Sequence, residues 1–320
     1  MEILLGWFPK FDKIGIPSVA GMVMQTSLTG SVSDKNKNHY HVEKGNRLVV
    51  KSPNVGYEDD IWREYIIGLK LNQLRKDIPN FMYMFGIFKC NAVFHRRNPS
   101  ALMCTKSQPI VGFSIMQFID GKTLETMIYE QKLEPHEMIL IVLQIMLALL
   151  HAKEMFQFSH NDLHPGNVMI IAEDPPRPVT YPCSFLPTKK ITVTTNLIPV
   201  IIDYGMSSIY ISEAKTNLDK PTRSRYDCMI LIDNILQISP QEFQKELRKF
   251  TNFSIILQSH EQIISNILNK MPHHYKTYDF NKQTMTINLL GKTKPAIKCS
   301  CKVSSDVLLD RLYRLIPIQE

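Results

Sequence analysis

Short apolar runs alternate with polar residues over the first third of the chain, and this pattern predicts a small sheet. The expected strands lie in a hairpin over about 22–33 and at about 47–52, 81–88 and 112–118. Residues 58–74 instead carry apolar side chains at helical spacing after an acidic start, which predicts an amphipathic helix. We therefore expect a five-stranded sheet with one helix, preceded by an extension over residues 1–20.

The apolar period becomes helical after about residue 120. Pro135 is suited to the first turn of a helix that runs to about Met155, and apolar residues on nearly all faces of this helix predict burial in a larger core. Its most apolar run, Met138 to Leu150, has 13 residues. Because a bilayer span needs about 20 apolar residues, we expect no membrane anchor.

The last third of the chain predicts further helices and one polar stretch. Ser239 is followed by proline and, three residues on, by Glu242, which has the form of a capping box and predicts helices up to about Met271. Residues 273–303 are polar and predict a loop or hairpin, and residues 304–315 predict a final amphipathic helix.

Composition and charge narrow the class of protein. The chain has 320 residues, of which 44% are apolar, so it can bury a sizeable core and is not of a disordered type. Its 37 basic and 30 acidic residues give a net charge of +7, which favours anionic ligands such as nucleotide phosphates. The basic residues are scattered and form no arm or aromatic-interleaved patch, so we expect no direct nucleic-acid binding.

The six cysteines form no C-x-x-C pair, and the C-x-C at Cys299 and Cys301 lacks a second half for a zinc site. They are interpreted as reduced thiols of an intracellular protein, cytoplasmic in a host cell or carried in a virion if the protein is viral. The amino terminus, MEILLGWFPKFDK, has an acidic second residue and too short an apolar run for a secretion signal.

Two polar motifs carry the candidate chemistry. The stretch FSHNDLHPGNVMI sets His160, Asp162 and Asn167 in an H-x-D-x-x-x-x-N spacing between an apolar segment and a β-like run. Asp162 could accept or orient the proton of an attacking hydroxyl, and Asn167 could hold Mg²⁺ on a triphosphate, while His160 supports the turn. An apolar run then ends at Asp203 in the turn of VIIDYG, where the aspartate would be the second metal ligand.

These motifs resemble those of the protein kinase superfamily, of the eukaryotic serine/threonine type. HNDLHPGN stands where that superfamily has H-R-D-L-K-x-x-N, and DYG stands where it has D-F-G. The resemblance implies a bilobal α+β fold with the nucleotide in a cleft. Residues 1–120 would be a small β-rich N-lobe, and residues 121–320 a larger, mainly helical C-lobe.

The resemblance also assigns nucleotide-binding residues in the first third of the chain. LVVK places Lys51 where V-A-I-K carries the lysine that grips the phosphates, and Glu64 in the following helix would pair with it. The alternatives are a strand-end lysine and a solvated glutamate. Gly30 and Val32 match only the end of G-x-G-x-x-G-x-V, so that hairpin could equally be an ordinary one.

SIMQFIDGKTL resembles the hinge that follows the last strand of the N-lobe. In that alignment the backbone of Gln117, Phe118 and Ile119 would contact adenine, and Met116 would lie at the back of the pocket. The aspartate of YDCMILIDNIL, Asp227, would hydrogen-bond the backbone of the catalytic loop, although a plain helix cap would need the same residue.

Several departures from the superfamily pattern bear on function. Asn161 replaces the usual arginine, so a switch by phosphorylation of the activation segment is not expected. His164 replaces a lysine, no A-P-E motif follows, and 36 positions separate Asn167 from Asp203. We interpret roughly 173–197 as an inserted loop with one extra strand, which either binds a partner or fills space. These departures resemble the kinases of large DNA viruses.

The sequence therefore predicts an ATP- and Mg²⁺-dependent serine/threonine protein kinase acting on a protein substrate. Two alternatives stay open. The D-L-H-P-G-N motif and the missing A-P-E are also typical of small-molecule kinases of the same superfamily, and the poor glycine loop is compatible with a catalytically inactive scaffold. The physiological substrate does not follow from the sequence.

Overall fold

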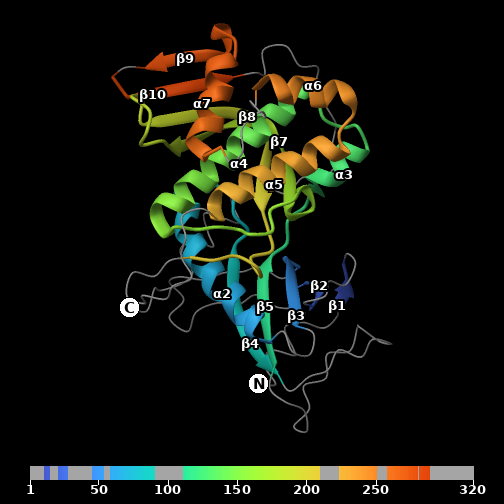
Figure 1. The fold of residues 1–320 in the computed structure, drawn as a ribbon. Helices are drawn as coiled ribbons and strands as arrows, with labels where there is room; N and C mark the ends of the chain where they lie inside the picture. The colour runs from blue at the N-terminus through green and yellow to red at the C-terminus, as the bar shows by residue number, and fades with distance from the viewer. Residues whose placement is uncertain are drawn as a thin grey trace. The chain divides into compact units, whose positions relative to one another are not determined.

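The structure is a computed structural model that describes residues 11–14, 21–27, 45–53, 58–90, 111–209, 223–250, 258–279 and 281–288 (Figure 1). The fold is mixed α+β with two five-stranded sheets. The chain forms two compact units, each discontinuous in sequence. The first comprises Met1–Tyr65, Met84–Phe118 and Ile297–Glu320, and the second comprises Ile66–Tyr83 and Ile119–Ala296.

The sheet of the first unit has the strand order β1-β2-β3-β5-β4, and all its neighbours are antiparallel. Its strands are β1 (Phe11–Lys13), β2 (Gly21–Ser27), β3 (Arg47–Pro53), β4 (Met84–Cys90) and β5 (Val111–Gln117). The helix α2 (Glu58–Asn72) begins in this unit, continues into the second, and is followed by the 3-10 turn η1 (Gln73–Lys76). The predicted amphipathic helix is present. The sheet has five strands as predicted, but its first strand, β1, lies in the segment that was predicted to be an extension.

The core of this sheet is lined by methionine, aliphatic and aromatic side chains. Met24, Val50 and Phe113 are fully buried. Gly21 lies where β2 and β3 approach closely, because a Cβ built there would come 2.3 Å from the carbonyl oxygen of Ser52. A side chain at this position would therefore force the two strands apart.

The second unit contains a sheet that the sequence did not predict. Its strand order is β6-β7-β8-β10-β9, with β10 parallel to β8 and the other neighbours antiparallel. The strands are β6 (Lys122–Thr123), β7 (Val168–Pro182), β8 (Lys190–Ile201), β9 (Lys276–Asp279) and β10 (Thr284–Asn288). The hairpin expected within 273–303 is β9 and β10.

The expectation of an inserted loop over 173–197 is corrected by this sheet, because most of the segment belongs to β7 and β8. The two strands pair along their length, with a register shift between Ala172 and Arg177. The several prolines of β7 made it resemble a loop, since proline cannot donate to a ladder. Every second residue of β8 between Ile191 and Thr195 is buried, which supplies the amphipathic pattern that holds the hairpin on the core.

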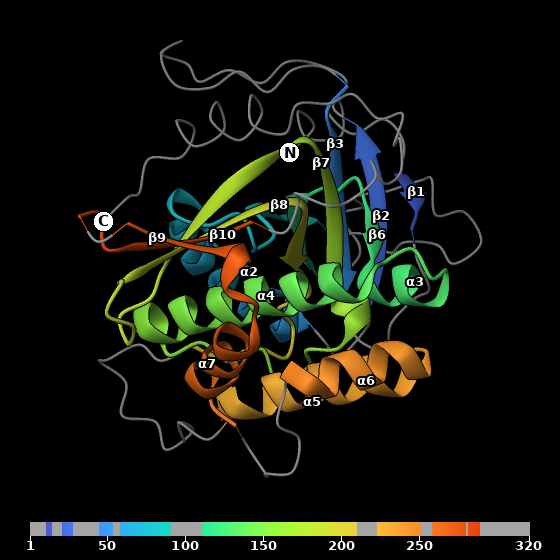
Figure 2. The same cartoon turned by 90° about the horizontal axis from the view of Figure 1, so that it is seen from above.

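The helices of the second unit pack on this sheet. They are α3 (Leu124–Tyr129), α4 (Pro135–Phe156), α5 (Arg223–Ile238), α6 (Gln241–Phe250) and α7 (His260–Lys270), with the 3-10 turns η2 (Pro165–Asn167) and η3 (His273–Tyr275). Figure 2 shows α4 between the sheet strands β7, β8 and β10 on one side and α5, α6 and α7 on the other. This layered position explains why α4 is apolar on nearly all faces.

The bounds predicted for α4 are confirmed within one residue at its end. Pro135 follows the N-cap Glu134, which forms a capping box with Glu137, and the helix ends at Gln157 in a left-handed conformation. In the described part of the chain, α4 is the helix long and apolar enough to cross a membrane by length and composition, with a mean hydropathy of 1.8. Because 78% of that window is buried inside the protein, α4 has the character of a core helix.

The capping box predicted at Ser239 is wrong. The Oγ of Ser239 is buried without a hydrogen-bond partner, and α6 begins one residue later than that box requires, with the amide of Gln244 donating to the carbonyl of Pro240. A capping box of the same type occurs instead at α7, between Ser259 and Gln262. The predicted helix at 304–315 lies outside the described residues, as does most of the extension at 1–20.

Candidate functional site

The segment from Phe158 to Asn167 connects α4 to β7 and is anchored by buried apolar side chains. Phe158 and Leu163 are almost completely buried. The ring of Phe158 makes edge-to-face contacts with Phe81, at 5.9 Å between centroids, and with Tyr204, at 6.4 Å. These buried side chains therefore hold in place the backbone that carries the polar residues of the loop.

Asp227 in α5 holds the loop by its backbone, as the sequence predicted. Its two carboxylate oxygens accept from the amides of His160 and Asn161, each at 2.7 Å. Burial raises the pKa of Asp227 to about 7, while the two amide donors act in the opposite direction and favour the carboxylate. Two short bonds from one buried carboxylate fix the loop immediately before Asp162.

His160 is fully buried and joins the two candidate motifs. Its Nε2 lies 2.9 Å from the carbonyl oxygen of Ile202, the residue before Asp203. Burial lowers the pKa of His160, and the negative charges of Asp203 and Asp162 both raise it. The contact with Ile202 joins the imidazole to the turn that carries Asp203, in line with the structural role predicted for His160.

Asn167 links the loop at residues 158–167 to the end of β8. Its Nδ2 donates to the backbone oxygen of Asp162 at 2.9 Å and lies 3.4 Å from Oδ2 of the same residue. The amide of Ile202 donates to the carbonyl oxygen of Asn167 at 3.0 Å. Asn167 is therefore hydrogen-bonded to Asp162 by its side chain and to the residue before Asp203 by its backbone. The side chain of Asp162 itself is exposed.

Asp203 lies in a tight turn at the end of β8. Its φ of 61° is in the left-handed region, which aspartate and asparagine tolerate better than most residues. The next residue, Tyr204, is fully buried, with its hydroxyl 3.1 Å from the carbonyl oxygen of Met82 and 3.0 Å from that of Ile201. The buried tyrosine pins the turn, while the side chain of Asp203 is half-buried.

Lys51 and Glu64 form a buried ion pair within the first unit. The Nζ of Lys51 lies 3.1 Å from Oε2 of Glu64, and the two side chains are 6% and 1% exposed. Lys51 points from β3 and Glu64 from α2, so the predicted pairing of strand and helix is present. The alternatives of a strand-end lysine and a solvated glutamate do not agree with this burial.

The predicted hinge follows β5. Met116 is 3% exposed in the sheet, opposite Val49 of β3, and Gln117 ends the strand. Phe118 is half-buried, and the guanidinium of Arg47 lies 3.5 Å from the centre of its ring, a cation–π contact that the sequence did not indicate. Ile119 is buried in the second unit. Gly30 and Val32 lie outside the described residues.

The available donors suit a hard divalent cation. Asn167 offers an amide oxygen and Asp203 a carboxylate, and Mg²⁺ is typically held by one or two such groups together with substrate phosphates. Within the described ranges, no group of three or more His, Cys, Asp and Glu side chains is arranged to hold a metal ion. Asn167 and Asp203 are therefore the residues that could hold such an ion together with phosphates.

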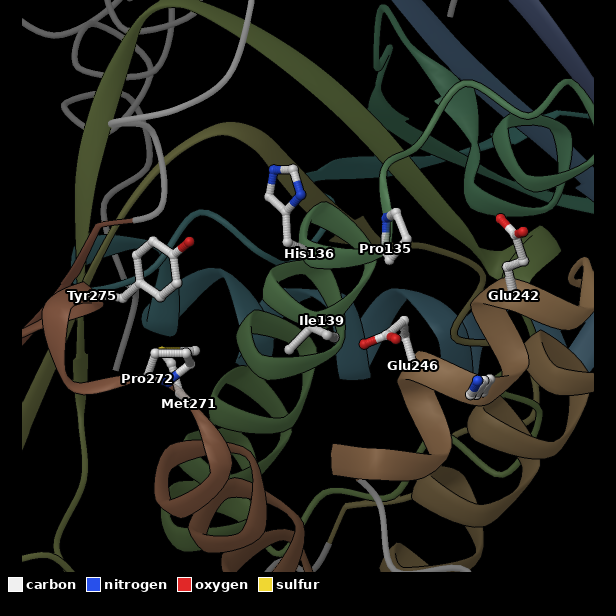
Figure 3. Close-up of a pocket in the computed structure, with 9 residues that line it drawn as sticks. Pro135, His136, Ile139, Glu242, Glu246, Met271, Pro272 and Tyr275 are labelled. Carbon is white, nitrogen blue, oxygen red and sulfur yellow. The ribbon is translucent and has the colours of Figure 1, made fainter.

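A cavity of about 560 Å³ lies elsewhere in the second unit (Figure 3). Figure 3 shows Glu246 and Tyr275 on opposite sides of Ile139. The lining residues come from the start of α4, from α6 and from the segment after α7, namely Pro135, His136, Ile139, Glu242, Lys245, Glu246, Met271, Pro272 and Tyr275. None of the predicted site residues lines it, so this cavity is separate from the cluster at Asp162.

Two curated viral proteins are similar to the chain. "Probable kinase 098L" of Invertebrate iridescent virus 3 is 23% identical over 272 residues, which cover 78% of this chain and 48% of that protein. "Uncharacterized protein 179R" of Invertebrate iridescent virus 6 is 30% identical over 175 residues, 52% of this chain and 13% of that protein. The chain thus spans about half the length of the first relative and far less of the second. No protein-family model matches. The chain is distantly similar to a viral protein named as a probable kinase.

Proposed function

We propose that the chain is an ATP- and Mg²⁺-dependent phosphotransferase of bilobal, kinase-like architecture that transfers the γ-phosphate to a serine or threonine of a protein. Asp162 orients the attacking hydroxyl and accepts its proton. Asn167 and Asp203 hold the metal ion, which neutralises charge on the phosphates when bound. Lys51 binds the phosphates and is oriented by Glu64, and the backbone after β5 holds the adenine.

One observation carries this proposal. Ile202, the residue before Asp203, makes two backbone contacts with the loop. Its carbonyl oxygen lies 2.9 Å from Nε2 of His160, and its amide donates to the carbonyl oxygen of Asn167 at 3.0 Å. The loop that carries Asp162 and Asn167 is thus bonded to the residue next to Asp203, although the two motifs lie far apart in sequence, and this supports the proposal. Phosphoryl transfer depends mainly on such alignment and on charge stabilisation, because the protein forms no covalent bond to the phosphate.

The test is transfer of labelled γ-phosphate from ATP to generic protein substrates in the presence of Mg²⁺. Asp203→Asn is the informative variant, since asparagine tolerates the positive φ and removes only the negative charge. We expect transfer to fall by at least about 100-fold with an unchanged melting temperature. Full activity of this variant, or no transfer by the unmodified protein to any acceptor, would contradict the proposal.

A small-molecule kinase is the second candidate, favoured by the geometry of His164. Its Nδ1 accepts from the amide of Gly166 at 3.1 Å, so this histidine caps the turn η2 and presents a compact ring where a protein kinase has an extended lysine. A metabolite panel run beside the protein substrates separates the two candidates. Magnesium-dependent ATP binding without turnover on either panel would instead favour a scaffold.

A further inference from the structure

The catalytic loop is bonded residue by residue to the segment that follows Asp203. The amide of Ser159 donates to the carbonyl of Ser208 at 3.0 Å, and the amide of Ser208 donates back to Ser159 at 2.8 Å. The hydroxyl of Ser207 donates to the carbonyl of His160 at 3.2 Å. Residues 159–161 and 206–208 therefore form a short antiparallel bridge, which we call the loop bridge.

Asn161 closes the loop bridge with its side chain. Its Nδ2 donates to the carbonyl oxygen of Met206 at 2.9 Å and lies 3.2 Å from Oγ of Ser208. The backbone of Asn161 has a φ of 65°, a conformation that asparagine adopts more readily than other residues with a β-carbon. Because its amide is held by Asp227 at 2.7 Å, the residue is fixed from two sides.

We propose that Asn161 is a positioning residue that keeps Asp162 and Asp203 in a constant relation through the loop bridge. This inference rests on the proposed function. Asn161 directly precedes Asp162, and Met206 follows Asp203 by three residues. The side chain of Asn161 is a neutral amide that donates to a backbone carbonyl and a hydroxyl. This contact therefore does not depend on phosphorylation of the segment that follows Asp203.

The expected consequence is a loss of alignment rather than a loss of folding. A displacement of about 1 Å at reacting groups can lower a rate by roughly 100-fold. If the turn at Asp203 moves, the binding of Mg²⁺ should also weaken. If Asn161 contributed to stability alone, the folded protein would keep its ordinary dependence of kcat on Mg²⁺ concentration. This dependence therefore distinguishes a positioning role from a purely structural one.

The experiment compares Asn161→Gly, Asn161→Asp and Ser208→Ala in the full chain. Glycine tolerates the positive φ and removes the side chain. Aspartate keeps the shape but replaces the donor by an acceptor and adds a negative charge, and Ser208→Ala removes only one acceptor. Thr180→Ala is the control, because it deletes an exposed hydrogen bond to Thr192 on the β7 and β8 hairpin. Two quantities are measured: hydrogen exchange at the Ser159 and Ser208 amides, and kcat as a function of Mg²⁺ concentration.

We expect faster exchange at these two amides and a loss of about 10- to 100-fold in kcat in both Asn161 variants. Asn161→Gly, which adds no charge, should also need more Mg²⁺ for half-maximal rate. Ser208→Ala should show a smaller shift in the same direction, and Thr180→Ala none. Exchange and magnesium dependence equal to those of the unmodified protein in both Asn161 variants would overturn the inference. If the unmodified protein transfers no phosphate, the proposed function fails, while the exchange measurement still decides whether Asn161 holds the bridge.

Discussion

The Lys51 and Glu64 pair and the loop around Asp162 bury polar groups in opposite ways. In the first unit, two oppositely charged side chains meet at 3.1 Å and are almost completely buried. In the second unit, the loop is held largely through its backbone, by Asp227 at 2.7 Å on one side and by Ser208 on the other. Removing one member of a buried ion pair leaves the other charge uncompensated, which is costly. Removing one side chain from a network of backbone contacts costs only the contact that is lost.

The largest effect is expected at Glu64. Glu64→Gln removes the negative charge that lies 3.1 Å from the buried Lys51 ammonium, which should lower the free energy of unfolding by about 3 kcal/mol or more. Urea denaturation measures this cost. Adding Lys51→Met should recover part of the loss, because the double variant buries no unbalanced charge.

Asp59→Asn on the same helix is the matched control, since Asp59 is exposed and should change stability by less than about 0.5 kcal/mol. A Glu64→Gln variant as stable as this control would show that the pair contributes little. Additive effects of the two changes at Lys51 and Glu64 would likewise count against a coupled pair.

The second prediction concerns His260, a buried polar side chain whose ring nitrogens have no hydrogen-bond partner, in contrast to the two regions compared above. His260 at the start of α7 is 1% exposed, and neither ring nitrogen has a hydrogen-bond partner. The pKa of His260 is lowered to about 4, mainly by burial and also by the charge of Lys153, while Glu261 acts in the opposite direction. Between about pH 6.5, the ordinary pKa of histidine, and pH 4, His260 binds a proton in the unfolded chain but not in the folded one. The free energy of unfolding should therefore fall as the pH decreases through this range.

Between pH 6.5 and 4 this linkage amounts to roughly 3 kcal/mol. His260→Leu should remove that part of the pH dependence, and unfolding curves collected at several pH values measure the change. His273→Gln, at an exposed position, should keep the original slope. Parallel pH profiles for the unmodified protein and His260→Leu would mean that His260 is not the titrating group.

The sequence predicted those parts of the molecule whose signals are local. The α4 helix has its proline start and continuous apolar run within one segment, and Lys51 and Glu64 lie on neighbouring elements. The β7 strand was missed because its prolines resemble a loop, and its sheet is completed by β10, about 90 residues beyond β8 in sequence. Such parallel pairing between distant segments leaves no periodic signal of its own.

The candidate site divides in the same manner. The spacing of a motif suggested Asp162, Asn167 and Asp203 as candidates. The bonds of Asp227 to the loop backbone were predicted because this aspartate leads an apolar helical run in α5. The contact of Asn161 with Ser208 joins residues 47 positions apart and depends on a positive φ. An asparagine beside a histidine is a weak signal for such a conformation, so the loop bridge became visible only in three dimensions.

The smallest effect is expected from single hydroxyl groups, and it separates the cluster at Asp162 from the cavity. Tyr204→Phe removes a buried hydroxyl that contacts the carbonyl oxygens of Met82 and Ile201, while Tyr275→Phe removes one that lines the cavity between α4 and α6. We expect Tyr204→Phe to cost about 1 kcal/mol of stability and to lower phosphotransfer severalfold, because the turn at Asp203 is pinned by this residue. Tyr275→Phe should leave both unchanged. If the tyrosine of the cavity proved the more sensitive in phosphotransfer assays, the reacting groups would have to be sought near α6 instead of at the end of β8.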